Sequence, residues 1–86
     1  MIKCNTIEYR KGFIEVRADI HESNINVEVW NIHPGVNITN VSLGDYSLKN
    51  ESVIANTEIE LSITNAEDLI LQLQKAIDAS RANNDT

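Results

Sequence analysis

Residues 53–77, "VIANTEIELSITNAEDLILQLQKAI", contain the change of pattern that decides the fold. Up to residue 63, apolar and polar side chains alternate, which is typical of a half-buried β-strand. In this strand we expect the side chains of Ile59, Leu61 and Ile63 to face inward. Those of Glu58, Glu60 and Ser62 should face outward. Beyond residue 63, apolar residues recur every three or four positions, which indicates an amphipathic helix.

The predicted helix begins at Asn65. Thr64 and Glu67 match the Ser/Thr-x-x-Glu capping box, whose side chains satisfy otherwise unpaired amide groups at a helix N-terminus. The stripe that we expect to face the core consists of Ala66, Leu69, Ile70, Leu73 and Ile77, with Ala76 at its edge. Leu71 lies about 150° from the centre of this stripe, so we expect it to face solvent. It is either an ordinary exposed leucine or a contact for a loop or a second subunit.

Two further strands are predicted at residues 13–20 and 25–30, joined by a short loop at residues 21–23. In the first strand the two faces carry Ile14, Val16, Ala18 and Ile20 on one side and Phe13, Glu15, Arg17 and Asp19 on the other. In the second strand Ile25, Val27 and Val29 oppose Asn26, Glu28 and Trp30. Pro34 and Gly35 then predict a type II turn, because proline fixes φ and glycine accepts a positive φ.

The remaining segments carry weaker patterns. Residues 2–9 predict a strand with a bulge near Asn5, followed by a hairpin loop at residues 10–12. Residues 36–43 predict another strand, which a turn at Gly44 and Asp45 follows. Residues 46–52 form either a short strand or a loop.

Strands followed by a single helix favour an α+β fold, an antiparallel β-meander of four to six strands with one C-terminal α-helix packed on one face. The 86 residues are enough for one compact domain, which we expect to span residues 1–81, with a frayed tail at residues 82–86. A helix of about 17 residues spans roughly 25 Å and covers only one face of a small sheet. The second face must meet water or another molecule.

This second face is the candidate partner-binding surface. We expect it to display five carboxylates and two aromatic rings, those of Glu15, Asp19, Glu28, Glu58, Glu60, Phe13 and Trp30. A tryptophan among carboxylates suits a protein partner that has a basic surface and an apolar pocket. Two simpler readings stand beside this one: the carboxylates form an ordinary solvated surface, and Trp30 packs over Phe13 or Arg17 to shield the sheet. Leu71 completes the candidate set.

The charge balance excludes several partner classes. Thirteen acidic residues against seven basic ones give a formal charge of −6, and the basic residues are scattered along the chain. This balance disfavours direct binding to nucleic acid and to anionic membranes. No apolar run approaches the roughly 20 residues of a membrane-spanning helix. We see no secretory signal, and the single cysteine, Cys4, reads as a small hydrophobe, so we expect a cytoplasmic protein.

The sequence contains no recognisable signature of a metal site or of catalysis. Cys4, His21 and His33 are the only candidate nitrogen or sulfur ligands, and they lack the paired short spacing of zinc sites. A glycine-rich phosphate loop, a nucleophile elbow and an HExxH motif are also missing. We therefore expect no enzyme, no metal and no cofactor. A catalytic role for the two histidines with nearby carboxylates is the weakest alternative.

The C-terminal stretch "NTEIELSITNAEDLILQLQKAIDAS", residues 56–80, resembles the ending of small phage and mobile-element proteins. The shared features are an exposed acidic strand, a Thr-capped turn and a helix of the form A-x-x-L-x-x-x-L-x-x-A. Such proteins include anti-CRISPR and other counter-defence factors, many of them compact, acidic and non-enzymatic. The resemblance implies an inhibitor of a nucleic-acid-handling host protein. The alternative is a structural or accessory phage protein that forms a homodimer or larger homo-oligomer through its uncovered sheet faces or Leu71.

Overall fold

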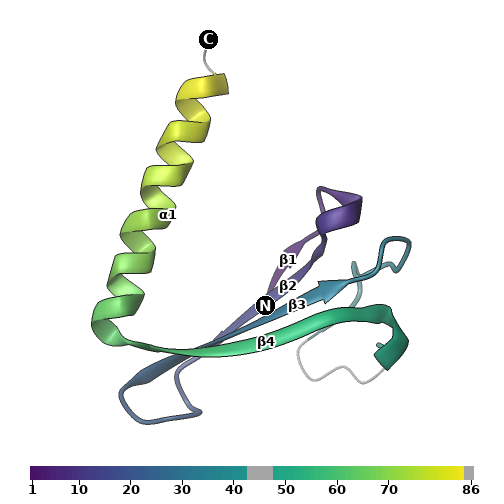
Figure 1. Cartoon of the computed structure of the whole chain (residues 1–86), viewed down its shortest axis with the longest axis horizontal. Coiled ribbons are helices and arrows are strands. Elements are labelled where there is room, and N and C mark those ends of the chain that lie inside the picture. The colour runs from purple at the N-terminus through teal and green to yellow at the C-terminus, as the bar shows by residue number, and fades with distance from the viewer. Residues whose placement is uncertain (43–47, 85–86) are drawn as a thin grey trace.

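Four antiparallel strands and one long helix form the main regular structure of residues 1–42 and 48–84, the part of the chain that this computed structural model describes. The elements are β1 (Ile2–Cys4), the 3-10 helix η1 (Glu8–Arg10), β2 (Gly12–Arg17), β3 (Asn24–Ile32), the 3-10 helix η2 (Asn50–Ser52), β4 (Val53–Ser62) and α1 (Ile63–Asn84). The strands lie in the order β1-β2-β3-β4, each antiparallel to the next (Figure 1). The predicted α+β meander with a C-terminal helix is confirmed.

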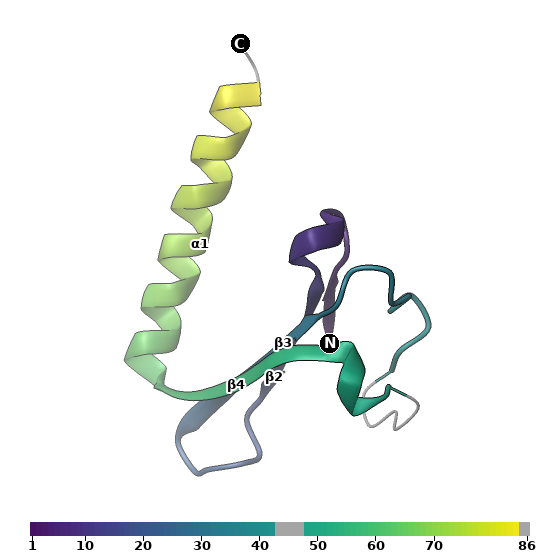
Figure 2. The same ribbon diagram turned by 45° about the vertical axis from the view of Figure 1, so that its right-hand side comes forward.

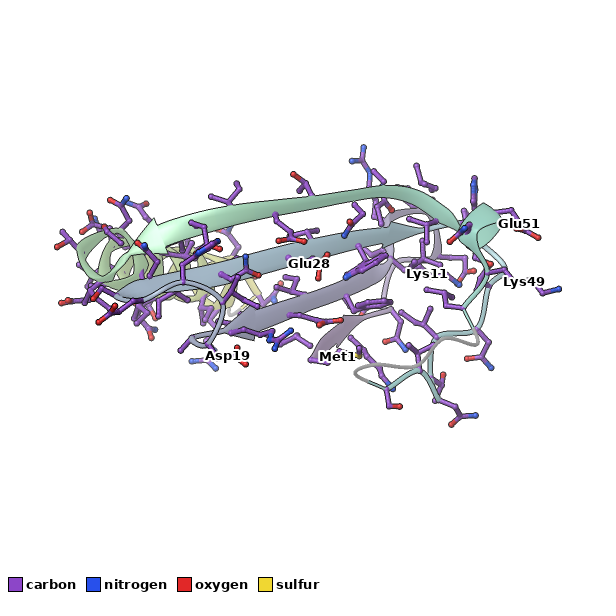
Figure 3. The ribbon with its side chains drawn as sticks, turned by 90° about the horizontal axis from the view of Figure 1, so that it is seen from below. Met1, Lys11, Asp19, Glu28, Lys49 and Glu51 are labelled. Carbon is purple, nitrogen blue, oxygen red and sulfur yellow. The ribbon has the colours of Figure 1, made fainter. Side chains whose placement is uncertain are left out.

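The register of the strands gives the sheet two chemically different faces. Glu15 lies opposite Glu28, which lies opposite Glu58, and two residues away Phe13 lies opposite Trp30. These side chains share one side, which we call the acidic face. Figure 3 views the sheet from the side away from α1, and the labelled Glu28 lies on that side. The apolar residues that alternate with these side chains therefore lie on the same side as α1, because neighbouring residues of a strand point to opposite faces.

The turn after β3 forms as predicted. The amide of Val36 donates to the carbonyl oxygen of His33 at 3.3 Å, and Gly35 has a φ of 89°. A positive φ at the third residue of the turn is the mark of type II geometry, which glycine adopts without steric strain. The turn directs the chain back toward the sheet.

The core is small and lies at one end of the sheet. Its buried members are Phe13, Ile32, Ile38 and Val41, with Trp30, Val36, Leu48 and Val53 packed around them. The predicted strand at residues 36–43 is wrong over residues 36–42, which instead fold over this end of the acidic face. Asn37 Oδ1 accepts from the amide of Thr39, and such side-chain bonds compete with strand pairing. Residue 43, the expected turn at Gly44 and Asp45, and residues 46–47 lie outside the described residues.

The first hairpin also differs from the prediction. β1 ends at Cys4, and residues 8–10 form η1, so the predicted strand through Tyr9 with a bulge near Asn5 is wrong. Gly12 begins β2 where the backbone of β3 is very close: a Cβ at this position would lie 1.8 Å from the carbonyl oxygen of Trp30. Only glycine permits this approach. Residues 48–52 contain η2 and no strand, so the loop alternative holds for them.

The helix begins two residues earlier than predicted. Ser62 Oγ accepts from the amide of Asn65 at 3.0 Å, so Ser62 caps the helix in place of Thr64. β4 ends at this same serine, and no residue separates strand from helix. The helix continues through Asn84, three residues beyond the expected end of the domain at residue 81.

The helix does not lie across the sheet, which corrects the expectation that it packs on one face. Near its start α1 contacts β4 and β3, and it then rises away from both strands (Figure 2). Every described residue of α1 except Ala66 is exposed. The radius of gyration is 15.0 Å, whereas a compact chain of this length has about 12 Å. The covering layer that the sequence predicts is thus not formed within one chain.

Candidate functional site

Three glutamates form a straight row across the acidic face. Glu15 on β2, Glu28 on β3 and Glu58 on β4 lie directly opposite one another, with about 5 Å between neighbouring strands. Glu60 lies on the same face, two residues along β4. Like charges placed directly opposite in a sheet are destabilising, so this row has an energetic cost that random surface placement would avoid. The register thus brings together four of the five carboxylates that the sequence places here.

Two asparagines hold these carboxylates in place, and they were missed as site residues by sequence reasoning. Asn26 Nδ2 donates to Glu58 Oε2 at 3.3 Å and to Glu60 Oε1 at 2.7 Å, and Asn26 is buried. Asn56 Nδ2 donates to Glu28 Oε2 at 3.1 Å and to the carbonyl oxygen of Val29 at 3.2 Å. The available signal was the alternation itself, which puts both amides on the glutamate side of their strands. Neutral donors thus orient the row and leave its charge intact.

Cationic partners are scarce around this row. Among the described residues, no lysine, arginine or histidine nitrogen lies within 4.0 Å of Glu15, Glu28 or Glu58. His21 Nε2 lies 3.8 Å from Glu60 Oε1 at the end of the sheet nearest the helix. Within residues 1–42 and 48–84, the three carboxylates of the row therefore have no ion-pair partner.

Asp19 lies beyond the end of β2, outside the paired strands, which corrects the expectation that the strand extends to it. β2 ends at Arg17, and Asp19 lies in the following hairpin, where its carboxylate accepts from Arg17 Nε at 3.0 Å and Nη2 at 2.8 Å. These hydrogen bonds lower the pKa of Asp19 and raise the pKa of Arg17. The nearby charges of Glu15 and Glu28 contribute to the raised pKa of Arg17. Arg17 is thus paired with Asp19 at the edge of the row.

The two aromatic rings are not free anchors. Phe13 is 4% exposed, and its ring stacks on that of Trp30 with centroids 5.6 Å apart at 28°. Phe13 is therefore a core residue, and its assignment to an open binding surface is wrong. Trp30 is half-buried, and within the described part of the chain its buried Nε1 has no hydrogen-bond partner. The simpler reading of Trp30, a cross-strand cluster that shields the sheet, describes its packing.

A buried lysine fastens the segment that covers these rings. Lys11 Nζ lies 2.8 Å from Glu8 Oε1 and also donates to the carbonyl oxygen of Val36. The same Glu8 oxygen accepts from the amide of Gly35 at 2.5 Å. The hydrogen bond from Lys11, followed by that from Gly35, lowers the pKa of Glu8. This contact joins η1 to the turn after β3 and so positions the core.

The opposite side of the sheet is a continuous apolar surface, which we call the apolar face. Its members are Ile2, Ile14, Val16, Ile25, Val27, Val29, Ile59 and Leu61. Val16 is 56% exposed and Ile59 is 59% exposed, although both lie in paired strands. Isolated exposed apolar residues are ordinary, but a contiguous patch of this kind marks an interaction surface.

The helix carries a second exposed apolar surface. The predicted core stripe is present as a helical pattern, yet Leu73 at its middle is 54% exposed. Leu71, on the other side of the helix, is 59% exposed, in keeping with its predicted orientation. Exposure therefore does not distinguish Leu71 from the stripe, and both sides of α1 meet solvent in the single chain.

Metal-ligand clusters and membrane-spanning helices are both missing from residues 1–42 and 48–84. Within these ranges no group of three or more histidine, cysteine, aspartate or glutamate side chains is arranged to hold a metal ion. Over the same residues, no helix is both long and apolar enough to cross a membrane. Comparison of the chain with protein-family models, curated proteins and solved structures finds no match.

Proposed function

We propose that this chain is a non-enzymatic protein-binding module that presents its acidic face to a basic surface of a protein partner. The row of Glu15, Glu28 and Glu58 carries the proposal. The row is destabilising to the sheet by itself, and contact with a cationic surface removes that repulsion. Binding thus recovers free energy that folding gives up.

The geometry of the row favours a rigid, prearranged contact. The three carboxylates project from paired strands, and side-chain amides of Asn26 and Asn56 fix two of them. Groups that are already ordered lose little conformational entropy on binding, which raises affinity. The carboxylates also increase the association rate with a positively charged partner through long-range attraction.

A nucleic-acid-handling protein is the partner class that we propose. The strands that carry these glutamates are about 5 Å apart, and one amide of Asn26 reaches both Glu58 Oε2 at 3.3 Å and Glu60 Oε1 at 2.7 Å, so the carboxylates form a dense line of negative charge. A groove that binds nucleic acid carries lysine and arginine side chains for a similar line of phosphates. The resemblance of the strand-helix ending to counter-defence proteins supports an inhibitor of the anti-CRISPR type that acts in the cytoplasm of a bacterial host.

Charge-matched variants test this function. In one variant Glu15, Glu28 and Glu58 become glutamine, and in the control the exposed Glu51→Gln, Glu67→Gln and Asp68→Asn give the same change in net charge. Tagged proteins are used to capture partners from bacterial lysate, with circular dichroism to verify folding. We expect a nucleic-acid-binding protein that the wild type and the control capture and that the row variant loses. Added duplex DNA should release it by competition.

The proposal is contradicted if the row variant captures the same proteins as the control, or if duplex DNA releases none of them. Raising the salt concentration provides a second measurement on the same partner. Capture through the acidic face weakens with salt because the interaction is between exposed charges.

A further inference from the structure

The chain exposes more surface area than a compact monomer of the same mass. The accessible area is 6660 Å², whereas a compact protein of 9.6 kDa exposes about 5,100 Å². The excess is about 1,600 Å² for each chain. Apolar side chains contribute to this excess area, because the apolar face and the apolar stripe of α1 are both exposed. The helix and the apolar face also lie on the same side of the sheet.

We infer that a second copy of this chain covers the apolar face, and that each copy lays its helix α1 across the apolar face of the other. This interface is separate from the acidic face, which lies on the opposite side of the sheet. The helix-on-sheet layer that the sequence predicts then forms between two chains.

A helix cannot easily cover its own sheet in this chain, because the connection is too short. β4 ends at Ser62 and α1 begins at Ile63, whereas connections between strands and helices usually contain several residues. Ser62 is paired with Asn24 in the sheet and also caps the helix through its hydroxyl group. Folding α1 back onto its own sheet would require residues that this junction lacks, so the helix projects outward, as Figure 2 shows.

The dimensions of the two surfaces match. The 22 residues of α1 span about 33 Å, and the 9 and 10 residues of β3 and β4 span about 30 to 34 Å. The helix stripe of Leu69, Leu73 and Ile77 contains no charge, and neither does the apolar face. The stripe of a helix from another copy can therefore lie along the apolar residues of these strands without burying an ionised group.

The area also matches that of a stable homodimer. Burying the excess on both chains removes about 3,200 Å² from water, within the range of about 2,000 to 5,000 Å² that obligate homodimers bury. Reciprocal exchange uses the same pair of surfaces twice and is closed by a two-fold axis. The two acidic faces remain outside, one on each copy.

Cysteine cross-linking tests which chain supplies the helix. Cys4→Ser removes the native thiol, and Leu73→Cys or Val27→Cys then places a single thiol at the middle of the stripe or of the apolar face. Wild-type mass is measured first by light scattering, and we expect twice the mass of one chain. The two single-cysteine chains are then refolded together and oxidised, and we expect a disulfide-linked heterodimer that forms at least several times faster than in the control. The control replaces Leu73→Cys by Lys75→Cys, on the opposite side of the same helix.

Three results would overturn the inference. The first is a monomer by light scattering at high protein concentration. The second is a dimer in which neither Leu73→Cys with Val27→Cys nor the second pair, Ile77→Cys with Ile59→Cys, reacts faster than the control. The third is a chain carrying both cysteines that closes on itself as a monomer. The acidic-face variant should still dimerise, so failure of this inference is distinguishable from failure of the proposed function.

Discussion

The side-chain amide of Asn26 donates a hydrogen bond to Glu60 across the β3–β4 pair, with Nδ2 2.7 Å from Oε1. The same amide reaches Glu58, so one buried neutral group joins two carboxylates of β4. Asn26 is thus a buried polar residue whose amide is bonded to the carboxylates of the acidic face. These bonds make Asn26 the residue whose loss should disturb that face most.

Asn26→Asp should lower the free energy of unfolding by about 2 kcal/mol, because it replaces a donor to two carboxylates with a third negative charge. Urea denaturation at neutral pH measures the effect. Asn24→Asp, on the same strand, is the matched control and should change stability far less, because the Asn24 amide donates only to the backbone carbonyl oxygen of Glu22, at 3.4 Å, and to no carboxylate. Equal effects at the two positions would contradict the assigned role of Asn26.

Glu28→Gln should raise the free energy of unfolding by about 0.5 kcal/mol, because it removes the central charge of the row and keeps an acceptor for Asn56. The gain should shrink in high salt, which screens repulsion between partly exposed charges. Glu51→Gln, at an exposed site in η2, serves as the comparison. A loss of stability in Glu28→Gln would show that the row is not under repulsion.

Gly12→Ala should destabilise the protein by about 2 kcal/mol or more, because the new Cβ would overlap the carbonyl oxygen of Trp30 and force β2 from β3. Gly35→Ala provides a contrast, since no atom outside residues 34–36 lies within 4 Å of the added carbon and only the positive φ opposes it. That substitution should cost about 1 kcal/mol. Thermal unfolding of both variants distinguishes a packing clash from backbone strain, and the reverse order would refute the distinction.

The contact between Glu8 and Lys11 should make the free energy of unfolding depend on pH in the acidic range. The folded state lowers the pKa of Glu8, so its contribution is fully present above the unfolded value of about 4.3 and is lost as the pH falls through the lower folded value. Glu8→Gln should therefore be less stable than wild type at pH 7. The difference should narrow once the pH falls below the folded value. Paired urea titrations across this pH range measure it, and a constant difference would exclude Glu8 as the titrating group.

The midpoint of thermal unfolding should rise with protein concentration if a second copy covers the apolar face. Association that requires the folded chain stabilises that chain by mass action, by up to about 2.7 kcal/mol over a hundredfold range of concentration. Leu73→Lys should weaken this dependence, whereas Lys75→Leu should leave it. Scanning calorimetry over that range provides the measurement, and a midpoint that is independent of concentration would argue for a monomer.

Local pattern was enough to predict β2, β3 and β4 and the chemistry of their two faces. Strand alternation has a period of two residues, so the facing positions of Glu15, Glu28 and Glu58 follow from the sequence once the strands are antiparallel. The turn at Pro34 and Gly35 could be predicted for a similar reason, because the allowed φ values of these two residues nearly specify it. These features depend on neighbours along the chain.

Features that depend on distant contacts could not be predicted in this way. The spacing of Ile38 and Val41 is compatible with a strand and also with an irregular segment that packs over Phe13. Only the contacts in the folded core distinguish the two. The capping box at Thr64 and Glu67 placed the start of the helix two residues too late, because Ser62, which the alternation assigns to the strand, is the residue that caps it. The position of α1 was predicted wrongly because an apolar stripe indicates only that a helix packs against an apolar surface. It does not identify that surface.

β4 and α1 are joined directly, Ser62 to Ile63, so this junction sets the direction of the helix relative to the sheet. If copies of the chain exchange helices as inferred above, the angle at this junction decides whether the exchange closes as a dimer or continues as an open-ended filament. Inserting a few glycines between β4 and α1 would allow the helix to pack on the sheet of its own chain. The stoichiometry of the inferred assembly would thus depend on the direct connection between β4 and α1.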